Sequence, residues 1–251
     1  MVLMKETIPL FKVFMSPTAK DKAGEVLDSG YIGQGPKVDE FEKQIGDYFG
    51  NNKVVTTNAG TSALHLALHL LKKPKPHWNE DVFQGVAFVS HNWPGIEDGD
   101  EVLATPLTCT ASNWPIVANN LKIKWVDIDP TTLNMCLKDL EKKMTPKTKA
   151  IMGVHWGGYP LDLDKIRDIR AKFRGKHGWA PALIEDGAHA FGSKYKGKYL
   201  GNHNNFVMNS LQAIKHITSV DGGLLYCPHD ELYERAKLLR WYGIDRNPKG
   251  R

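Results

Sequence analysis

The chain alternates short apolar runs with longer amphipathic stretches along most of its 251 residues. This alternation is typical of βαβα units, in which each helix returns the chain to add another strand to the sheet. The apolar runs predict strands at 54–57, 101–105, 122–127, 150–155, 182–185, 206–209 and 223–227. The amphipathic stretches predict helices at about 36–49, 62–71, 111–119, 135–143, 163–174 and 230–241. The sequence therefore predicts an α/β fold built on a doubly wound, mostly parallel sheet.

Three further segments flank or interrupt this pattern. An earlier helix is predicted where Ser16 could cap its start, Pro17 could take its first position and Gly30 follows its end. Residues 73–99 are irregular and rich in Pro, Trp and Asn, which is typical of an insertion between a helix and a strand. The final segment, GIDRNPKGR, follows an amphipathic helix abruptly, and we interpret the chain as incomplete.

Charge and cysteine content narrow the classes of partner. The formal net charge of +5 suits an anionic small molecule, but no run of five basic residues supports nucleic-acid binding. Cys109, Cys136 and Cys227 show no CxxC spacing, which argues against a zinc site or disulfide framework and for a reducing compartment. The sequence has neither a signal peptide nor an apolar run of membrane-spanning length. We therefore expect a cytoplasmic protein with no membrane partner and no metal site.

The turn between the first predicted strand and its following helix could hold a phosphate group. Gly60 permits close backbone approach, while Thr61 and Ser62 offer hydroxyls beside the free N–H groups of a helix N-terminus. The alternative is an ordinary helix cap, in which Thr61 or Ser62 satisfies those N–H groups.

A carboxylate follows the strand predicted at 182–185. In open α/β sheets, ligands bind at the C-terminal ends of the strands, and Asp186 lies there. Such a carboxylate can keep a pyridine nitrogen protonated, which makes the ring an electron sink. The alternative is that Asp186 only caps the following turn.

The third feature is a lysine in an apolar setting, Lys215, flanked by Ile214, His216 and Ile217. Partial burial near a cofactor's positive charge would lower its pKa, as an imine-forming amine requires. The alternative is a surface lysine on a loop. The phosphate turn, Asp186 and Lys215, 29 positions later (215 − 186), follow each other in the order that a pyridoxal 5'-phosphate (PLP) site needs.

Residues 31–242 also resemble the DegT/DnrJ/EryC1/StrS family of sugar aminotransferases. The matching segments are YIGQGPKVDEFEKQIGDYFG, NAGTSALHLAL, GDEVLATPLTCTASN, VDIDPTTLNM, KTKAIMGVHWGGYPLDLDKI, IEDGAHAFGSKYKGKYLGN and SLQAIKHITSVDGGLLY. The resemblance implies a PLP-dependent transferase of fold type I, an α/β/α sandwich with a mostly parallel central sheet. It also implies that 1–30 form an N-terminal arm and first helix, 31–242 the PLP-binding large domain, and 243–251 the start of a missing C-terminal domain.

The resemblance also implies a role for each site residue. Lys215 matches the Schiff-base lysine, Asp186 the partner of the pyridinium nitrogen, and His189 a position near the cofactor's phenolic oxygen. The positions matching the phosphate ligands are Gly60, Thr61 and Ser210, with Ser62 beside them. Cys109 departs from the family, because an aromatic residue commonly stacks on the cofactor at that position. We expect weaker stacking from the thiol without loss of chemistry; the alternative is that Cys109 is only a small packing residue.

The implied reaction is transamination of a keto-deoxy sugar on a nucleotide diphosphate, with L-glutamate as amino donor, for amino-sugar and surface-glycan synthesis. The fold type also implies a homodimer with shared active sites. Three alternatives stay open. One is a PLP-dependent sugar dehydratase, in which histidine replaces the lysine. Another is a glycosyltransferase using Asp127-Ile128-Asp129 as a DxD motif, and the third is a non-catalytic fragment.

Overall fold

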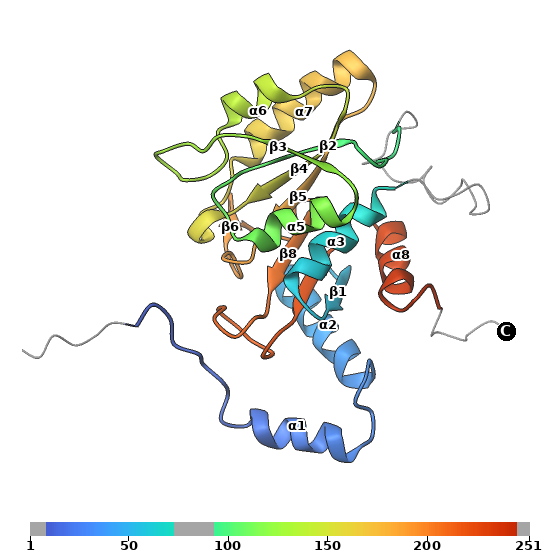
Figure 1. The fold of residues 1–251 in the computed structure, drawn as a ribbon. Coiled ribbons are helices and arrows are strands. Elements are labelled where there is room, and N and C mark those ends of the chain that lie inside the picture. Colours follow the sequence, from blue (N-terminus) through green and yellow to red (C-terminus); the bar gives the residue numbers. More distant parts are fainter. Residues whose placement is uncertain (1–8, 73–92, 245–251) are drawn as a thin grey trace, which may run out of the picture.

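The computed structural model describes residues 9–72 and 93–244. Its seven-stranded sheet has the order β1-β9-β8-β5-β4-β2-β3, and a separate two-stranded sheet pairs β6 with β7 (Figure 1). The strands are β1 (Val54–Thr57), β2 (Glu101–Ala104), β3 (Lys122–Trp125), β4 (Thr148–Val154), β5 (Ala182–Asp186), β6 (Lys194–Tyr195), β7 (Lys198–Tyr199), β8 (Phe206–Ser210) and β9 (Gly223–Tyr226). The helices are α1 (Ala19–Asp28), α2 (Pro36–Phe49), α3 (Gly60–Leu70), α5 (Thr110–Ala118), α6 (Leu137–Lys143), α7 (Leu163–His177) and α8 (Asp230–Arg240), with a short 3-10 helix η1 (Trp156–Gly158).

The sheet is parallel except at β9. Strands β2, β3, β4, β5 and β8 pair in parallel, whereas β9 is antiparallel to both of its neighbours, β1 and β8. The prediction of a mostly parallel sheet is therefore confirmed. Because six strands run the same way, the loops after β1, β2, β5 and β8 emerge at one edge, where ligands bind in sheets of this kind.

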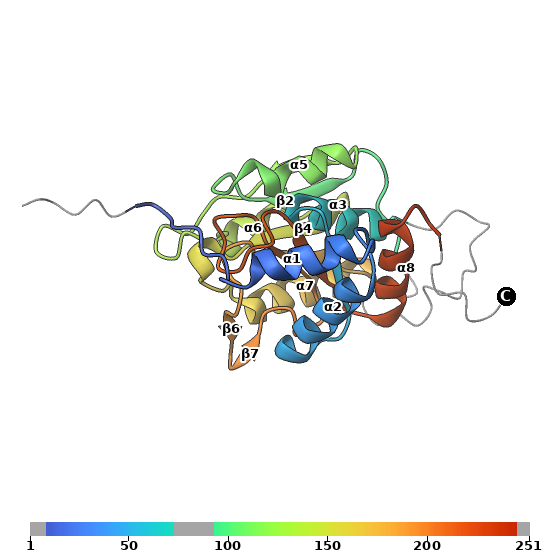
Figure 2. The same ribbon diagram turned by 90° about the horizontal axis from the view of Figure 1, so that it is seen from below.

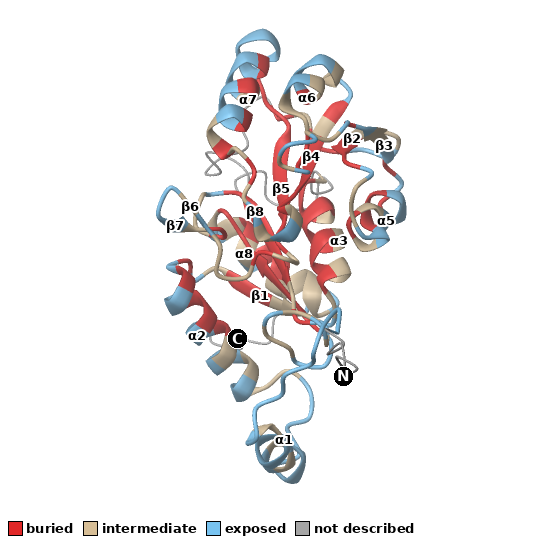
Figure 3. Ribbon diagram, turned by 90° about the vertical axis from the view of Figure 1, so that its left-hand side faces the viewer, coloured by how far each residue is buried: buried red, intermediate tan, exposed pale blue. Residues whose placement is uncertain are grey.

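Successive side chains of the strands point to opposite faces of the sheet and are buried on both, because a layer of helices covers each face. On β5, Ile184 packs in the cluster that includes residues of α3, α5 and α8, while Leu183 packs against residues of α6 and α7. On β9, Leu225 joins the first cluster, and Leu224 packs toward α2. The strands are buried between helices whose outer faces are exposed (Figure 3). The fold is a three-layer α/β/α sandwich.

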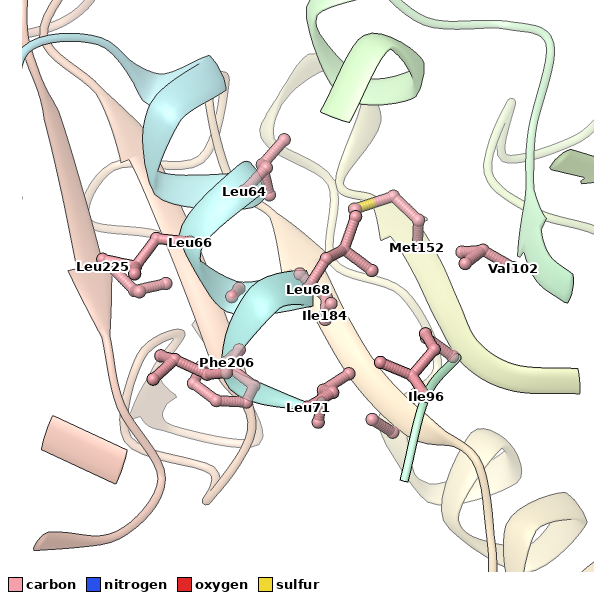
Figure 4. Packing of buried hydrophobic residues seen from close by; sticks show 14 of the residues in the cluster. Leu64, Leu66, Leu68, Leu71, Ile96, Val102, Met152, Ile184, Phe206 and Leu225 are labelled. Atoms are coloured by element: carbon pink, nitrogen blue, oxygen red, sulfur yellow. The ribbon is translucent and has the colours of Figure 1, made fainter. Parts of the chain in front are cut away.

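Helix α3 is the most deeply buried helix of this sandwich. Leu64 and Leu68 are fully buried and lie among side chains from β4, β5, β8 and β9 (Figure 4). The segment that precedes β2 also packs into this cluster, since Ile96 is 2% exposed and its N–H donates to the Leu71 carbonyl at 3.2 Å. Residues 93–96 of the expected insertion at 73–99 therefore pack into the core, while 73–92 lie outside the described residues.

The first helix begins later than predicted. α1 starts at Ala19 after the cap residue Thr18, whereas Ser16 and Pro17 precede it in a turn closed by the Ala19 N–H and the Ser16 carbonyl at 2.9 Å. The prediction of Ser16 as cap and Pro17 as first residue was wrong. The Ser16 hydroxyl bonds locally to Thr18, a contact that competes with helical geometry. Gly30 follows the helix with φ of 74°, as its predicted place after the helix end requires.

Helix α1 lies apart from the sandwich. It lies below the other elements in Figure 1 and crosses in front of them when the molecule is viewed from below (Figure 2). None of its residues is buried. A helix of this length gains little stability from its own hydrogen bonds. Since none of its residues is buried, contacts within the described part of the chain do not explain why this segment is helical.

Candidate active site

A cavity of about 380 Å³ opens where the loops after β1, β2, β5 and β8 meet. Seven of the eight predicted site residues line it: Gly60, Thr61, Cys109, Asp186, His189, Ser210 and Lys215. These residues are spread over more than 150 positions of sequence, from Gly60 to Lys215 (215 − 60), and the parallel strands bring them together. The eighth, Ser62, lines a neighbouring cavity of about 670 Å³ that shares only Thr61 with the first.

The turn before α3 has the geometry of an anion cradle. The helix begins at Gly60, and its cap residue is Ala59, which has no side chain to offer a capping hydrogen bond. Thr61 and Ser62 lie inside the first turn, so neither caps the helix, and the capping alternative is wrong for both. In the described part of the chain, the Ser62 N–H is the first of this turn to donate to the Ala59 carbonyl, at 3.1 Å, and the N–H groups of Gly60 and Thr61 precede it, where a helix leaves its N–H groups unsatisfied.

Two glycines allow this turn to pack tightly against the sheet. A Cβ atom on Gly60 would lie 2.8 Å from the Met208 sulfur and 3.2 Å from Ser210 Cβ. A Cβ atom on Gly223, which pairs with Ser210 in the sheet, would lie 2.5 Å from the Ala59 carbonyl oxygen. Both positions therefore need glycine for the helix N-terminus to approach β8 and β9. Ser210 lies beside the cradle for the same reason.

Asp186 is the buried charge of the cavity, with 4% of its surface exposed. Its Oδ1 accepts a hydrogen bond from the Ala188 N–H at 3.0 Å, so it does cap the turn after β5. Its Oδ2 accepts from the Ser112 hydroxyl at 2.5 Å, and that hydroxyl is also 2.6 Å from the Thr108 hydroxyl. The two interpretations of Asp186 are thus compatible, because the capping carboxylate also lines the cavity.

Ser112 is a site residue that sequence reasoning missed. It lies in the first turn of α5, three residues after the cap residue Cys109, and it is 1% exposed. A serine in the first turn of a helix usually indicates local capping. Only the three-dimensional packing of α5 beside β5 shows that its hydroxyl reaches Asp186. The signal available in the sequence was a small polar residue within the predicted apolar helix at 111–119.

Lys215 lies on the loop between β8 and β9. This loop is closed at its base by the Leu211 N–H, which donates to the Gly222 carbonyl at 2.9 Å. A turn inside the loop places the Lys215 N–H 2.9 Å from the Gln212 carbonyl. The side chain of Lys215 is half-buried and lines the cavity, although its neighbour Ile214 is 45% exposed. The alternative of a surface lysine on a loop is therefore correct about the loop. The side chain of Lys215 nevertheless lines the cavity.

His189 lies opposite Trp156 at the cavity wall. The two rings meet edge to face, with centroids 5.5 Å apart. Burial lowers the pKa of His189 below its ordinary value, and the nearby charge of Lys215 lowers it further, while Asp186 acts in the opposite direction. The imidazole is therefore neutral near pH 7 and can donate one hydrogen bond and accept another.

The remaining sequence motif, Asp127-Ile128-Asp129, lies just before a turn that begins at Pro130, and its Ile128 forms an antiparallel bridge with Met135. The Asp129 carboxylate accepts the Thr131 N–H at 2.8 Å, and Asp127 accepts the Ile128 N–H at 2.8 Å. Both carboxylates thus accept hydrogen bonds from nearby backbone N–H groups, and Asp129 forms an Asx turn with Thr131. Among the residues that the structure describes, no three His, Cys, Asp or Glu side chains form a group able to hold a metal ion.

The architecture identifies the class of fold: it is that of the PLP-dependent transferases of fold type I, shared with the solved sugar aminotransferase that superimposes on it. The chain belongs to the DegT/DnrJ/EryC1/StrS aminotransferase family, whose model matches residues 15–77 and 85–251. The gap in this match, 78–84, falls inside the segment predicted to be an insertion.

Three solved structures illustrate the similarity. AtS13 from Actinomadura melliaura is 50% identical, with a TM-score of 0.86 over 97% of this chain. The sugar aminotransferase CalS13 from Micromonospora echinospora is 43% identical, with a TM-score of 0.84 over 96% of this chain. A GDP-4-keto-6-deoxymannose-3-dehydratase, solved with a trapped PLP-glutamate geminal diamine, is 26% identical, with a TM-score of 0.79 over 96% of this chain. The chain spans 60%, 59% and 57% of these three chains, respectively. None of the helices in the described part of the chain is both long and apolar enough to span a membrane.

Proposed function

We propose that this chain carries the cofactor-binding part of a PLP-dependent sugar aminotransferase, with residues 31–242 as the cofactor-binding unit. The observation that carries the proposal is the single cavity into which Lys215, Asp186 and the Gly60–Thr61 turn converge. A transaminating site needs an amine, a buried carboxylate and an anion cradle at fixed separations. This cavity provides all three from separate loops.

The residues present fit PLP. The cofactor's phosphate would lie at the N-terminus of α3, where the close approach at Gly60 leaves no room for a side chain at that position. Ser210, beside that turn, would add a hydroxyl. Asp186 would face the ring nitrogen, because it is buried and already fixed by two hydrogen bonds. Bound PLP would supply an electron sink for the bonds around the substrate's reacting carbon.

The protein's own groups would then act as follows. Lys215 would hold the cofactor covalently through its Nζ atom and, once released, would move the proton at the substrate's reacting carbon. Asp186 would keep the proton on the ring nitrogen, since a buried carboxylate stabilises a cation beside it. His189, neutral near pH 7, would orient the cofactor's ring through a hydrogen bond.

We propose L-glutamate as the amino donor and a keto-deoxy sugar on a nucleotide diphosphate as the acceptor, in amino-sugar and surface-glycan synthesis. Support comes from two similar proteins: CalS13 is a sugar aminotransferase, and the dehydratase trapped glutamate on PLP. The acceptor's negative charge agrees with the net charge of +5 on this chain.

Spectroscopy of the full chain incubated with PLP tests the core of this proposal. Binding through Lys215 should give the visible absorbance band of a lysine-bound cofactor, and Lys215→Ala should abolish that band. Lys194→Ala removes an exposed lysine outside the cavity and serves as the matched control. If the band is absent in the unaltered chain, or survives in Lys215→Ala, the proposal is wrong.

A sugar dehydratase is the second candidate function, favoured by the similarity to the solved dehydratase. The two activities would convert the same keto sugar into different products. An aminotransferase returns an amino sugar and converts glutamate to its keto acid, whereas a dehydratase removes a hydroxyl group. Mass spectrometry of the products formed with glutamate separates them, and the presence of Lys215 favours the amino sugar.

We also propose a homodimer with shared active sites, in the cytoplasm. The dimer is supported by the segment before α1, where Leu10 and Phe14 are 97% and 76% exposed, and by α1 itself, which has no buried residue. A second copy would bury these side chains. Light scattering tests this, because Leu10→Asp combined with Phe14→Asp should shift the protein from dimer to monomer.

The three free cysteines support the cytoplasmic location.

A further inference from the structure

A second carboxylate, Glu185, directly precedes Asp186 but points to the opposite face of the sheet. Glu185 is fully buried on the side covered by α7, whereas Asp186 lines the cavity on the side of α3 and α5. Its Oε2 lies 2.8 Å from His155 Nε2, and its Oε1 accepts a hydrogen bond from the Asn205 amide at 2.8 Å. The transamination proposed above uses none of these three side chains.

The hydrogen bonds define the proton positions in this group. The Leu161 N–H donates to His155 Nδ1 at 3.0 Å, so that nitrogen carries a lone pair and the ring proton lies on Nε2. His155 therefore donates to Glu185, and both carboxylate oxygens receive a donor. Such an arrangement satisfies an ionised carboxylate in a buried site.

A cation on α7 completes the surroundings of Glu185. Burial lowers the pKa of Arg170 to about 10, and the charge of Glu185 opposes that shift. Arg170 stays protonated at neutral pH and donates from Nε to the Pro181 carbonyl at 2.7 Å. The positive charge of Arg170 thus acts on Glu185 from the face of the sheet away from the cavity.

His155 contacts two successive residues of β5. Its ring bonds to the Glu185 side chain, and its backbone N–H donates to the Asp186 carbonyl at 3.0 Å. Asn205, just before β8, holds Glu185 from the other side. The end of β5 is therefore fixed between the loop after β4 and the start of β8. A shift of this strand end would move the Asp186 carboxylate, because the side chain follows its own backbone.

We propose that His155, Glu185 and Asn205 are positioning residues for Asp186, which they hold in the orientation that a ring nitrogen in the cavity requires. They touch neither the cavity nor a substrate, so they are not catalytic residues. The proposal rests on the PLP-binding function above for its consequence, but the positioning itself is a property of the chain without cofactor.

The contacts of Glu185 with His155 and Asn205 are called the clamp below. Two variants remove contacts of this clamp, and a third keeps them. Glu185→Ala and His155→Ala delete the contacts. Glu185→Gln removes the charge but keeps the shape, because its amide can accept from His155 and donate to Asn205 once the Asn205 amide is turned over. Ile166→Ala is the matched control: Ile166 is fully buried in the layer on the same face but makes no polar contact with this group.

The first readout is hydrogen exchange of the Ala188 amide in the chain without PLP, since that N–H donates to Asp186 Oδ1. Glu185→Ala and His155→Ala should speed its exchange about tenfold relative to Ile166→Ala of equal stability, while Glu185→Gln should match the unaltered chain. Equal exchange in the clamp and control variants would overturn the positioning role. Asn205→Ala, which removes one donor, gives a milder variant if the others fail to fold.

The second readout is PLP affinity, from titration of the visible band. Glu185→Ala and His155→Ala should bind PLP about tenfold more weakly, as is typical when outer partners of a ligating group are lost, whereas Ile166→Ala should not. Faster Ala188 exchange with unchanged affinity would overturn the inferred consequence for PLP. Absence of PLP binding in the unaltered chain would instead refute the proposed function, and the exchange measurement would still decide the positioning role.

Discussion

The Ser112 hydroxyl lies 2.5 Å from Oδ2 of Asp186 and joins the first turn of α5 to the end of β5. Both residues are buried, with 1% and 4% of their surfaces exposed. Hydrogen bonds to a carboxylate are shorter and stronger than those between neutral groups. This contact restrains the Asp186 side chain on the cavity side of the sheet. On the opposite face, His155 and Asn205 contact the preceding residue, Glu185.

Ser112→Ala should therefore destabilise the chain and weaken PLP binding. The change leaves Oδ2 of Asp186 without its serine donor, and losing a hydrogen bond to a charged group costs about 1.5–3 kcal/mol of folding free energy. Ser112→Thr keeps the hydroxyl and should retain most of the stability. Urea denaturation without PLP and titration with PLP measure the two effects. Equal stability of Ser112→Ala and the unaltered chain would show that the contact contributes nothing.

Gly60→Ala should destabilise the chain and prevent PLP binding. The added methyl group would lie 2.8 Å from the Met208 sulfur, so the helix N-terminus must move away from β8. Overpacking of this kind costs about 1–3 kcal/mol in unfolding free energy. Gly175→Ala is the control, because a Cβ there meets nothing within 4 Å and alanine favours the interior of α7. Thermal denaturation should show opposite shifts in Tm for the two variants.

Most of the sheet and its helices could be predicted from the sequence. Strand β1 and helix α2 have the predicted bounds, because the strand is a short apolar run and the helix has Pro36 at its start and Gly50, in the left-handed conformation, after its end. The hairpin of β6 and β7 was not predicted, since its strands are two residues each and carry no apolar run. Periodicity needs more residues than that to be visible.

From the residue pattern alone, the cavity-lining residues could be predicted only where a residue acts through its position in the chain, and the family resemblance added Cys109, His189 and Ser210. Asp186 and Gly60 lie at a strand end and a strand-to-helix turn, and those places are visible in a sequence. Ser112, His155 and Asn205 act through contacts across 74, 30 and 20 residues, and these depend on how neighbouring elements pack. Ser112 was visible only as a small polar residue within an apolar helix, which does not indicate its partner, and the local pattern around His155 and Asn205 gives no sign of their contacts.

Stability should fall in mildly acidic solution, and His189 should contribute to the fall. Burial depresses the pKa of His189 below 6.5, so the unfolded chain binds a proton at this residue more readily than the folded chain does. The contribution is constant above the unfolded pKa, about 6.5, and unfolding becomes easier as pH falls from there toward the lower folded pKa. His65, His69 and His229 have pKa values lowered by burial as well and act in the same direction.

His189→Gln removes one of these groups and should flatten the pH dependence without abolishing it. Urea midpoints at about pH 7.5 and about pH 5 measure the change. His177→Gln, at the exposed end of α7, is the control. An identical acid loss in His189→Gln and in the unaltered chain would show that the folded pKa of His189 is not depressed.

Cys109→Phe should leave PLP affinity unchanged or raise it. The residue caps α5 with extended backbone angles, φ −67° and ψ 146°, which phenylalanine adopts without strain. Its thiol is exposed and lines the cavity, so a larger side chain has space toward solvent. An aromatic ring that stacks on the cofactor would contribute about 0.5–1.5 kcal/mol of binding free energy beyond the area it buries. Titration of the visible band compares Cys109→Phe with Cys109→Ala, which removes the sulfur without adding a ring. If both variants lose affinity sharply, the sulfur itself contacts the ligand, and stacking is not what this position contributes.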